Sequence, residues 1–237
     1  MIIGEQKPIQ DIIGSLGDRK DVRILVVGCD SCMTVSLAGG KEEVRDLVSD
    51  LTAHSRRKGL GWRVKGLTLK RQCERRFAEG ISADVQNADV VISLGCGVGA
   101  QSMSETFPER RIIPGINTSN MGAPEKKGVF KEKCMGCGRC TIDRTAGICT
   151  LARCAKGLQN GPCGGSVDGK CELYPEIDCA WHQVYTILEA RGELSEAVGG
   201  IDGCHRARPA QGLVQESQRR RQDREEQGVR PWKEQAS

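Results

Sequence analysis

The stretch that decides the fold is VRILVVG, residues 22–28. It is short, apolar and rich in β-branched residues, and it ends in glycine, which is typical of a strand buried on both faces of a parallel sheet. A second run of this kind, ADVVISL, occupies 88–94. Weaker strand candidates lie at 62–69 and 111–116. The sequence therefore predicts the strands of a parallel, doubly wound sheet.

Helical spacing separates these strands. An amphipathic helix is predicted over 41–58, and a second helix opens within 71–77. The residues 95–99, GCGVG, are expected to form the turn after the third strand. Strand, loop and helix thus alternate, which favours a Rossmann-like α/β domain with a parallel sheet over 21–120. The apolar residues that set the first helical pattern are Val44, Leu47, Val48 and Leu51.

The remaining chain is predicted to be organised differently. Periodicity stops after 117, and glycine and proline mark 121–133 as a connector. A cysteine-rich domain follows over 134–192, with little regular structure apart from a closing helix at 181–191. It has too few apolar residues to fold by burial alone, so bound metal is expected to act as its core. Residues 1–20 are a lead segment, and 193–237 are expected to be a disordered, basic tail.

The composition of the chain indicates its cellular location and the chemistry of its cysteines. Of 237 residues 38% are hydrophobic but only 3% are aromatic, so the chain is expected to rely on something besides ring packing. No apolar run approaches the length of a membrane span. The start lacks the pattern of a signal peptide, so we expect a cytoplasmic protein. Thiols stay reduced there, which favours metal binding over disulfides.

The net charge of +4 is concentrated near the end of the chain. Residues 205–237 hold 8 Lys and Arg against 5 Asp and Glu, which leaves +1 for residues 1–204. A nearly neutral folded part without aromatic stacking platforms argues against a nucleic-acid binder. The Arg-rich tail is interpreted as a solvated segment.

Twelve of the thirteen cysteines fall into three groups of four, and Cys204 is left over. The first group follows the predicted strands: two of its members come after the first strand, one after the second and one after the third. Because the carboxyl ends of parallel strands meet at one edge of a sheet, these four are expected to converge. Its members are Cys29, Cys32, Cys73 and Cys96.

Eight further cysteines crowd into 134–179. A CxxCxxC run opens them, and three thiols at this spacing suit one face of an iron–sulfur cubane better than a zinc knuckle. The preferred partition adds Cys179 to this run and groups the other four as a third centre, for which zinc remains an alternative. The second group is then Cys134, Cys137, Cys140 and Cys179, and the third is Cys149, Cys154, Cys163 and Cys171.

Other interpretations stay open for the first group. A lone CxxC is also a redox motif, and Cys73 and Cys96 also suit buried small apolar positions. Residues 95–100 resemble a phosphate-binding loop but lack its GxGxxG spacing. Their glycines are better interpreted as allowing close approach of the backbone to a cluster.

These residues carry a family resemblance. The run NGPCGGSVDGKCE at 160–172, followed by DCAW at 178–181, resembles the C-terminal domain of methylenetetrahydrofolate reductase. CGRC at 137–140 and CAKGL at 154–158 fit the same pattern. GCDSC at 28–32, LAGGKEEV at 37–44, RQCE at 71–74 and LGCGVG at 94–99 resemble the MetV-type small subunit of that reductase.

The resemblance implies two or three iron–sulfur clusters of the [4Fe-4S] type, with zinc as a further option. It implies a MetF-like catalytic partner that holds FMN and tetrahydrofolate, to which this non-catalytic subunit relays electrons in one-carbon metabolism. The electron donor would be a ferredoxin or a module like heterodisulfide reductase or hydrogenase. A zinc-stabilised scaffold subunit without redox function is the alternative.

Two residues depart from the family pattern. Ser36 stands where the family often has cysteine, which leaves Cys29, Cys32, Cys73 and Cys96 as the first quartet. Thr150 replaces a proline that is often found after Cys149, a change that affects turn stiffness more than ligation.

Overall fold

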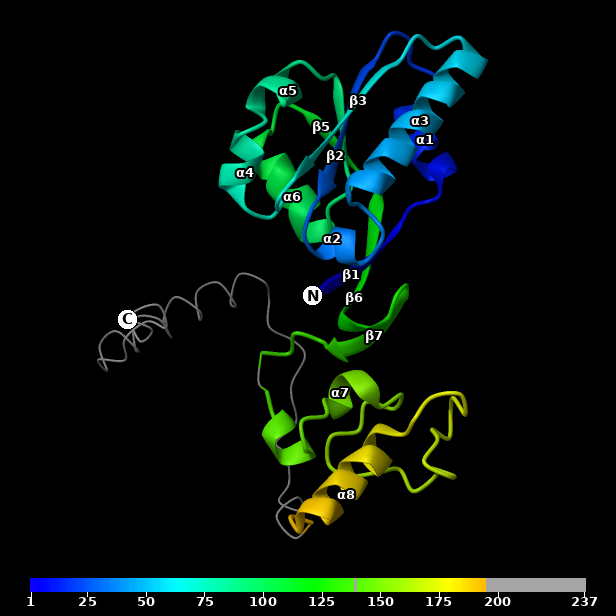
Figure 1. The fold of residues 1–237 in the computed structure, drawn as a ribbon, viewed down its shortest axis with the longest axis vertical. Coiled ribbons are helices and arrows are strands. Elements are labelled where there is room, and N and C mark those ends of the chain that lie inside the picture. Colours follow the sequence, from blue (N-terminus) through cyan, green and yellow to red (C-terminus); the bar gives the residue numbers. More distant parts are fainter. Residues whose placement is uncertain (139, 195–237) are drawn as a thin grey trace, which may run out of the picture.

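The computed structural model describes residues 1–138 and 140–194. Figure 1 shows an α/β lobe, a lobe made of the cysteine-rich segment, and a curved β-hairpin between them. The tail that is predicted to be disordered lies outside the described residues from 195 onward, and Cys204 lies outside them as well. Among the helices described, none has both the length and the hydrophobicity that crossing a bilayer requires.

A four-stranded parallel sheet forms the centre of the α/β lobe, in the order β3-β2-β4-β5. The first predicted run becomes the central strand β2, whose residues after Arg23 are all buried. Its register is continuous with both neighbours, from Ile24 beside Val90 to Cys29 beside Leu69. The predicted parallel α/β sheet is confirmed. Its strands are β2 (Arg23–Cys29), β3 (Arg63–Leu69), β4 (Val90–Ser93) and β5 (Arg111–Pro114).

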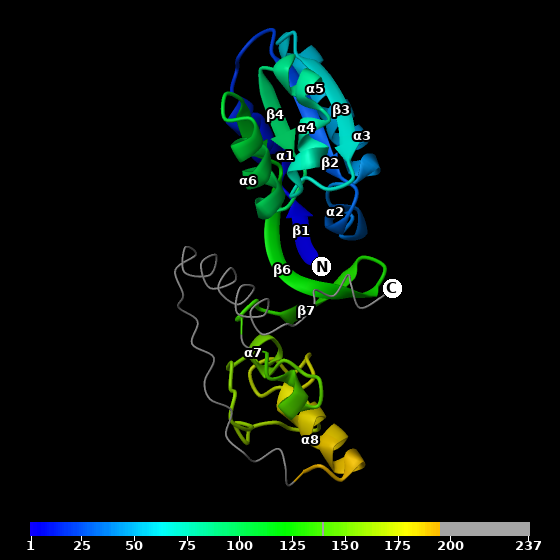
Figure 2. The same ribbon diagram turned by 90° about the vertical axis from the view of Figure 1, so that its left-hand side faces the viewer.

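Helices cover both faces of this sheet, because alternate residues of the strands point to opposite sides. Ile24 and Val26 pack with residues of α1 and α3 in one core. Leu25 and Val27 pack with residues of α4, α5 and α6 in another core. The two layers are visible around the sheet in Figures 1 and 2. The helices are α1 (Ile9–Leu16), α2 (Cys32–Val35), α3 (Lys41–Lys58), α4 (Arg75–Glu79), α5 (Ser82–Gln86) and α6 (Gly97–Thr106).

The prediction for 95–99 was wrong in extent. The turn is confined to its first residues, because Cys96 is the N-cap of α6 and the helix begins at Gly97. Gly97 and Gly99 lie in the first turn of the helix, where their low helix propensity concealed the start of the element.

A three-stranded antiparallel sheet occupies the region that was predicted to be a connector. The lead segment supplies β1 (Ile2–Gln6), which pairs with β6 (Ile116–Lys126), and β6 pairs in turn with β7 (Val129–Cys134). The stretch 121–133, for which the sequence shows no periodicity, is thus a β-hairpin. Bulges interrupt both pairings, and Pro124 lies within β6, so the alternation that marks a strand is broken in the sequence.

The cysteine-rich segment, residues 134–194, contains little regular structure among its described residues. Its secondary structure is limited to η1 (Ile142–Thr145), α7 (Thr150–Arg153), α8 (Ala180–Arg191) and two isolated bridges. The predicted closing helix is α8, and Trp181, Val184 and Leu188 on it form a small core. Six large apolar residues of this segment are instead exposed: Ile142, Val167, Leu173, Tyr174, Ile177 and Leu194.

An ion pair ties the start of β2 to the residue before β4 and makes the stability of the sheet depend on pH. Arg23 donates to both carboxylate oxygens of Asp89, at 2.6 and 3.1 Å, and lowers the pKa of Asp89 to about 2. A lowered pKa stabilises the fold above the ordinary value near 3.8, and this contribution is lost as the pH falls toward 2.

We therefore expect Asp89→Asn to lower the free energy of unfolding at pH 7 by no more than about 1 kcal/mol, since the pair is exposed to solvent. The difference should shrink as the pH falls from about 4 toward 2, because the carboxylate of the unfolded wild-type chain is protonated first and that of the folded chain last. Urea denaturation at pH 7, 4 and 2.5 measures this. A difference that stays constant down to pH 2.5 would contradict the assignment.

Candidate metal centres

The first group of cysteines lies at the carboxyl ends of the parallel strands. Cys29 ends β2 and is 6% exposed, Cys32 begins α2, and Cys96 caps α6 at 8% exposure. Cys73 lies in the loop between β3 and α4 and is exposed. The chain leaves β2 for β3 on one side and returns to β4 on the other, so this edge is a topological switch point, where open α/β sheets bind ligands.

The four thiols influence one another electrostatically. Burial raises the pKa of the Cys29 thiol, and the neighbouring Cys96, Cys73 and Cys32 raise it further. Burial also raises the pKa of Cys73, with further contributions from Cys96 and Cys32. A hydrogen bond from the backbone N–H of Gln72 opposes the shift at Cys29. The structure thus brings together residues that lie far apart in the sequence.

The position where the family often has cysteine does not offer a thiol here. Ser36 is buried, and its hydroxyl donates to the carbonyl oxygens of Cys32 at 2.8 Å and Ile2 at 3.3 Å. It therefore ties α2 to β1. The Ser36 hydroxyl is thus occupied by two backbone carbonyls. The sulfur ligands available at this edge are those of Cys29, Cys32, Cys73 and Cys96.

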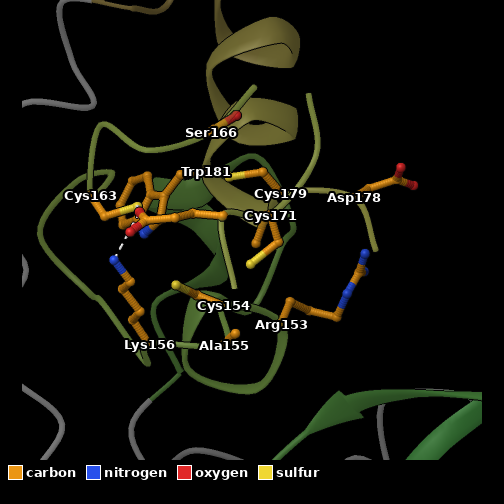
Figure 3. Close-up of a pocket in the computed structure, with 12 residues that line it drawn as sticks. Arg153, Cys154, Ala155, Lys156, Cys163, Ser166, Cys171, Asp178, Cys179 and Trp181 are labelled. Atoms are coloured by element: carbon orange, nitrogen blue, oxygen red, sulfur yellow. Dashed lines mark hydrogen bonds and ion pairs between the residues drawn. The ribbon is translucent and has the colours of Figure 1, made fainter. Parts of the chain in front are cut away.

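Four thiols line a pocket in the cysteine-rich segment (Figure 3). These cysteines come from the end of α7, from two loops and from the N-cap of α8. Trp181 closes one side, and its indole N–H donates to the carbonyl oxygen of Leu158 at 3.0 Å. The four are Cys154, Cys163, Cys171 and Cys179.

Charged side chains meet at the same pocket. Lys156 donates to Glu172 at 2.9 Å, and the same carboxylate oxygen accepts from the Cys163 thiol at 3.3 Å. The hydrogen bond from Lys156 lowers the pKa of Glu172. The backbone N–H of Gly165 also donates to the Cys163 sulfur, at 3.4 Å. The Gly165 amide is therefore the group that can stabilise negative charge on the Cys163 sulfur, whereas the charge of Lys156 is paired with Glu172.

The pocket groups the cysteines differently from the predicted partition. Cys179, which was assigned to the CxxCxxC run, lines the pocket with three members of the predicted third group. Cys149, the fourth member of that group, is the N-cap of α7, whereas Cys154 is its C-cap. α7 contacts β7, the strand that ends at Cys134. The arrangement thus favours an exchange of Cys149 and Cys179 between the two groups.

The CxxCxxC run itself is shaped by glycine. Gly136 and Gly138 have φ angles of +62° and +83°, which glycine adopts at little cost. These turns let the chain reverse between successive cysteines, and the N–H of Gly136 donates to the Cys134 sulfur at 3.3 Å. This is the same Cys-x-Gly hydrogen bond that Cys163 receives from Gly165.

None of the twelve described cysteines forms a disulfide. Within residues 1–138 and 140–194, no three Cys, His, Asp or Glu side chains are arranged to hold one metal ion. A cubane differs from a single ion because it presents a separate iron to each of its four thiolates. Each quartet supplies the four thiols that such a cluster requires.

Sequence reasoning missed Gln72, which lies beside Cys73 and is completely buried. A glutamine in a loop gives no sequence signal of burial. The two glycines Gly95 and Gly99 were visible in the sequence, and the structure shows what they accommodate: a Cβ on either would press against the Gln72 side chain. The room that these glycines leave is filled by this side chain.

Comparison with known proteins gives one match. The family model described as "Methylene-tetrahydrofolate reductase C terminal" matches residues 113–202. The match begins at the end of β5, so it includes β6 and β7 as well as the cysteine-rich segment. No curated protein and no solved structure matches the chain.

Proposed function

Because residues 113–202 carry a methylene-tetrahydrofolate reductase C-terminal domain, we propose that the chain is an iron–sulfur electron-transfer subunit of a methylenetetrahydrofolate reductase complex. In this proposal its clusters relay electrons to the FMN of a MetF-like catalytic partner, which reduces the methylene group carried by tetrahydrofolate to methyl. A ferredoxin or a module like heterodisulfide reductase or hydrogenase supplies the electrons.

The observation that carries the proposal is the grouping of thiols in fours, at a sheet edge and in a pocket. Cys29, Cys32, Cys73 and Cys96 would hold the first cluster. The pocket quartet, Cys154, Cys163, Cys171 and Cys179, would hold another. Cys134, Cys137, Cys140 and Cys149 would hold a third. Bound clusters supply one-electron carriers, and the protein tunes their potentials through N–H donors, charge and burial.

The local residues suit that role. Gly136 and Gly165 direct amide hydrogens at cysteine sulfurs, and such donors favour the more negative, reduced form of a cluster. The charge of Lys156 at the pocket is balanced by Glu172. The chain itself needs no binding site for folate or flavin in this proposal, because the partner subunit binds both.

The proposal is tested by joining the chain to a MetF-like flavoprotein. The two are expressed and purified separately under anaerobic conditions, and they are mixed in a stopped-flow spectrometer after the chain alone has been reduced with dithionite and freed of the excess. We expect electron paramagnetic resonance signals from the reduced chain and bleaching of the oxidised flavin on mixing. A reduced chain that is silent and leaves the flavin oxidised would contradict an electron-transfer role and would favour a scaffold.

Serine substitutions test how the eight clustered cysteines divide. We expect Cys179→Ser to abolish the same spectroscopic centre as Cys163→Ser, and the double variant to lose no more iron than either single variant. Cys149→Ser should instead abolish the centre that Cys137→Ser abolishes. Each loss should be about four irons per chain. The measurement is iron content together with the resonance spectrum.

Cys204→Ser is the matched control, because this cysteine belongs to none of the three groups and should leave all centres intact. If Cys179→Ser removes the same centre as Cys137→Ser, the partition first predicted from the sequence is correct and the grouping in the pocket is not.

A further inference from the structure

Gln72 is a buried polar side chain at the edge of the sheet where the first group of cysteines lies. It is 0% exposed, although it belongs to a loop. Its amide nitrogen donates to the carbonyl oxygen of Val27 at 2.7 Å, and its amide oxygen accepts from the Ser93 hydroxyl at 2.6 Å. It therefore links the ends of β2 and β4, the two strands that flank the switch point.

The hydrogen-bond chain continues from Ser93 to the next loop. The backbone N–H of Gly95 donates to the Ser93 hydroxyl oxygen at 3.2 Å. Gly95 and Gly99 both pack against the Gln72 side chain, and a Cβ on Gly95 would lie 2.7 Å from its amide oxygen. The sequence around the third strand is thus shaped to hold this one glutamine.

This network joins the three loops that carry the first group. Val27 lies two residues before Cys29, Gln72 immediately precedes Cys73, and Gly95 immediately precedes Cys96. Buried polar networks whose members are all satisfied fix a single arrangement of the groups around them. The backbone N–H of Gln72 also faces the Cys29 thiol, whose pKa it lowers.

We propose that Gln72 is a positioning residue that holds the three cysteine-bearing loops in register and sets the reduction potential of the first cluster. This inference rests on the proposed function. Its side chain fixes the backbone whose N–H points at Cys29, and hydrogen bonds to cluster sulfurs stabilise the reduced form. The side chain need not touch the cluster itself.

The test uses the full chain with its clusters and compares potentials. Gln72→Met keeps the length of the side chain but removes both amide hydrogen bonds. We expect the first cluster to become harder to reduce, with an equilibrium constant for reduction about tenfold lower, which is about 59 mV for one electron. Redox-poised electron paramagnetic resonance measures this, and a Cys96→Ser variant identifies the signal of the first cluster.

Two further variants, and the potentials of the other clusters, show whether Gln72 acts on the first cluster or whether its loss disturbs the whole protein. Ser93→Ala removes one link of the network and should shift the same potential in the same direction by less, so it decides the matter if Gln72→Met loses the cluster. Gln101→Met is the control, since that exposed amide donates to a carbonyl of its own helix. The potentials of the other clusters should stay unchanged.

Unchanged potential of the first cluster in both Gln72→Met and Ser93→Ala would overturn the inference while leaving the proposed function intact. An equal shift in Gln101→Met, or in all clusters together, would overturn it as well. A wild-type chain without acid-labile sulfide would overturn the proposed function, and the inference with it.

Discussion

Removal of bound metal is expected to unfold the cysteine-rich segment and to leave the α/β lobe folded. The core of this segment is small, with Trp181, Val184 and Leu188 as its buried residues and six partly buried residues packed against them. Such a core is small against the entropy of ordering some sixty residues. Because the free energy of metal binding adds to the free energy of folding, bound metal is expected to be a main source of stability here.

The α/β lobe has a different source of stability. Ile24, Val26, Leu51 and Ile92 are among the buried residues of its main core, and none of them depends on a metal. Hydrogen–deuterium exchange with mass spectrometry after anaerobic chelation measures both lobes at once. Peptides from 134–194 should lose their protection, and peptides from β2, α3 and β4 should keep it.

The stable lobe is the internal control in this experiment. Protection of 150–190 that persists after the metal content has fallen to zero would contradict the view that metal replaces a hydrophobic core there. Loss of protection in both lobes together would place the first cluster among the structural supports of the sheet.

Gly39→Ala is expected to be the most damaging single change near the first group. A Cβ at this position would overlap the carbonyl oxygen of Leu94, a backbone atom that cannot turn away. The Gly39 carbonyl also accepts the backbone N–H of Cys29 at 2.8 Å. This glycine therefore sets the distance between the loop that carries Cys29 and Cys32 and the loop that carries Cys96.

Forcing the two loops apart should destabilise the lobe by about 1–3 kcal/mol, the usual cost of an overpacked site. It should also deplete the first cluster while sparing the other centres. Urea denaturation gives the first quantity, and iron content with the resonance spectrum gives the second.

Gly14→Ala is the matched control, because this helical glycine has no neighbouring atom within 4 Å of the position of a Cβ. Alanine there should be neutral or stabilising by up to about 1 kcal/mol. A Gly39→Ala protein that matches Gly14→Ala in stability and iron content would show that the two loops are not in tight contact.

The sequence was sufficient for the parallel sheet because its signals are local. A fully apolar run such as 22–28 has to be buried on both faces, and the amphipathic spacing of 41–58 coincides with the bounds of α3. Placement of Cys29 and Cys96 after strands then followed from topology alone.

Signals that depend on tertiary partners were missed. The strand β6 is interrupted by bulges and by Pro124, and its partner β1 comes from more than 100 residues earlier in the chain. Gln72 is polar in the sequence and acquires its role only because β2 and β4 close around it. The grouping of Cys179 with Cys154 depends on how α7 and α8 pack, which the spacing of cysteines along the chain does not predict.

The count of iron, zinc and acid-labile sulfide in anaerobically purified protein tests the central claim most directly. Three thiol quartets that hold cubanes predict about twelve irons per chain and sulfide in equal number. About eight irons with one zinc would turn one quartet into a structural site and keep the chain an electron carrier. Zinc without acid-labile sulfide would contradict the account, because no cluster would then be present to carry electrons.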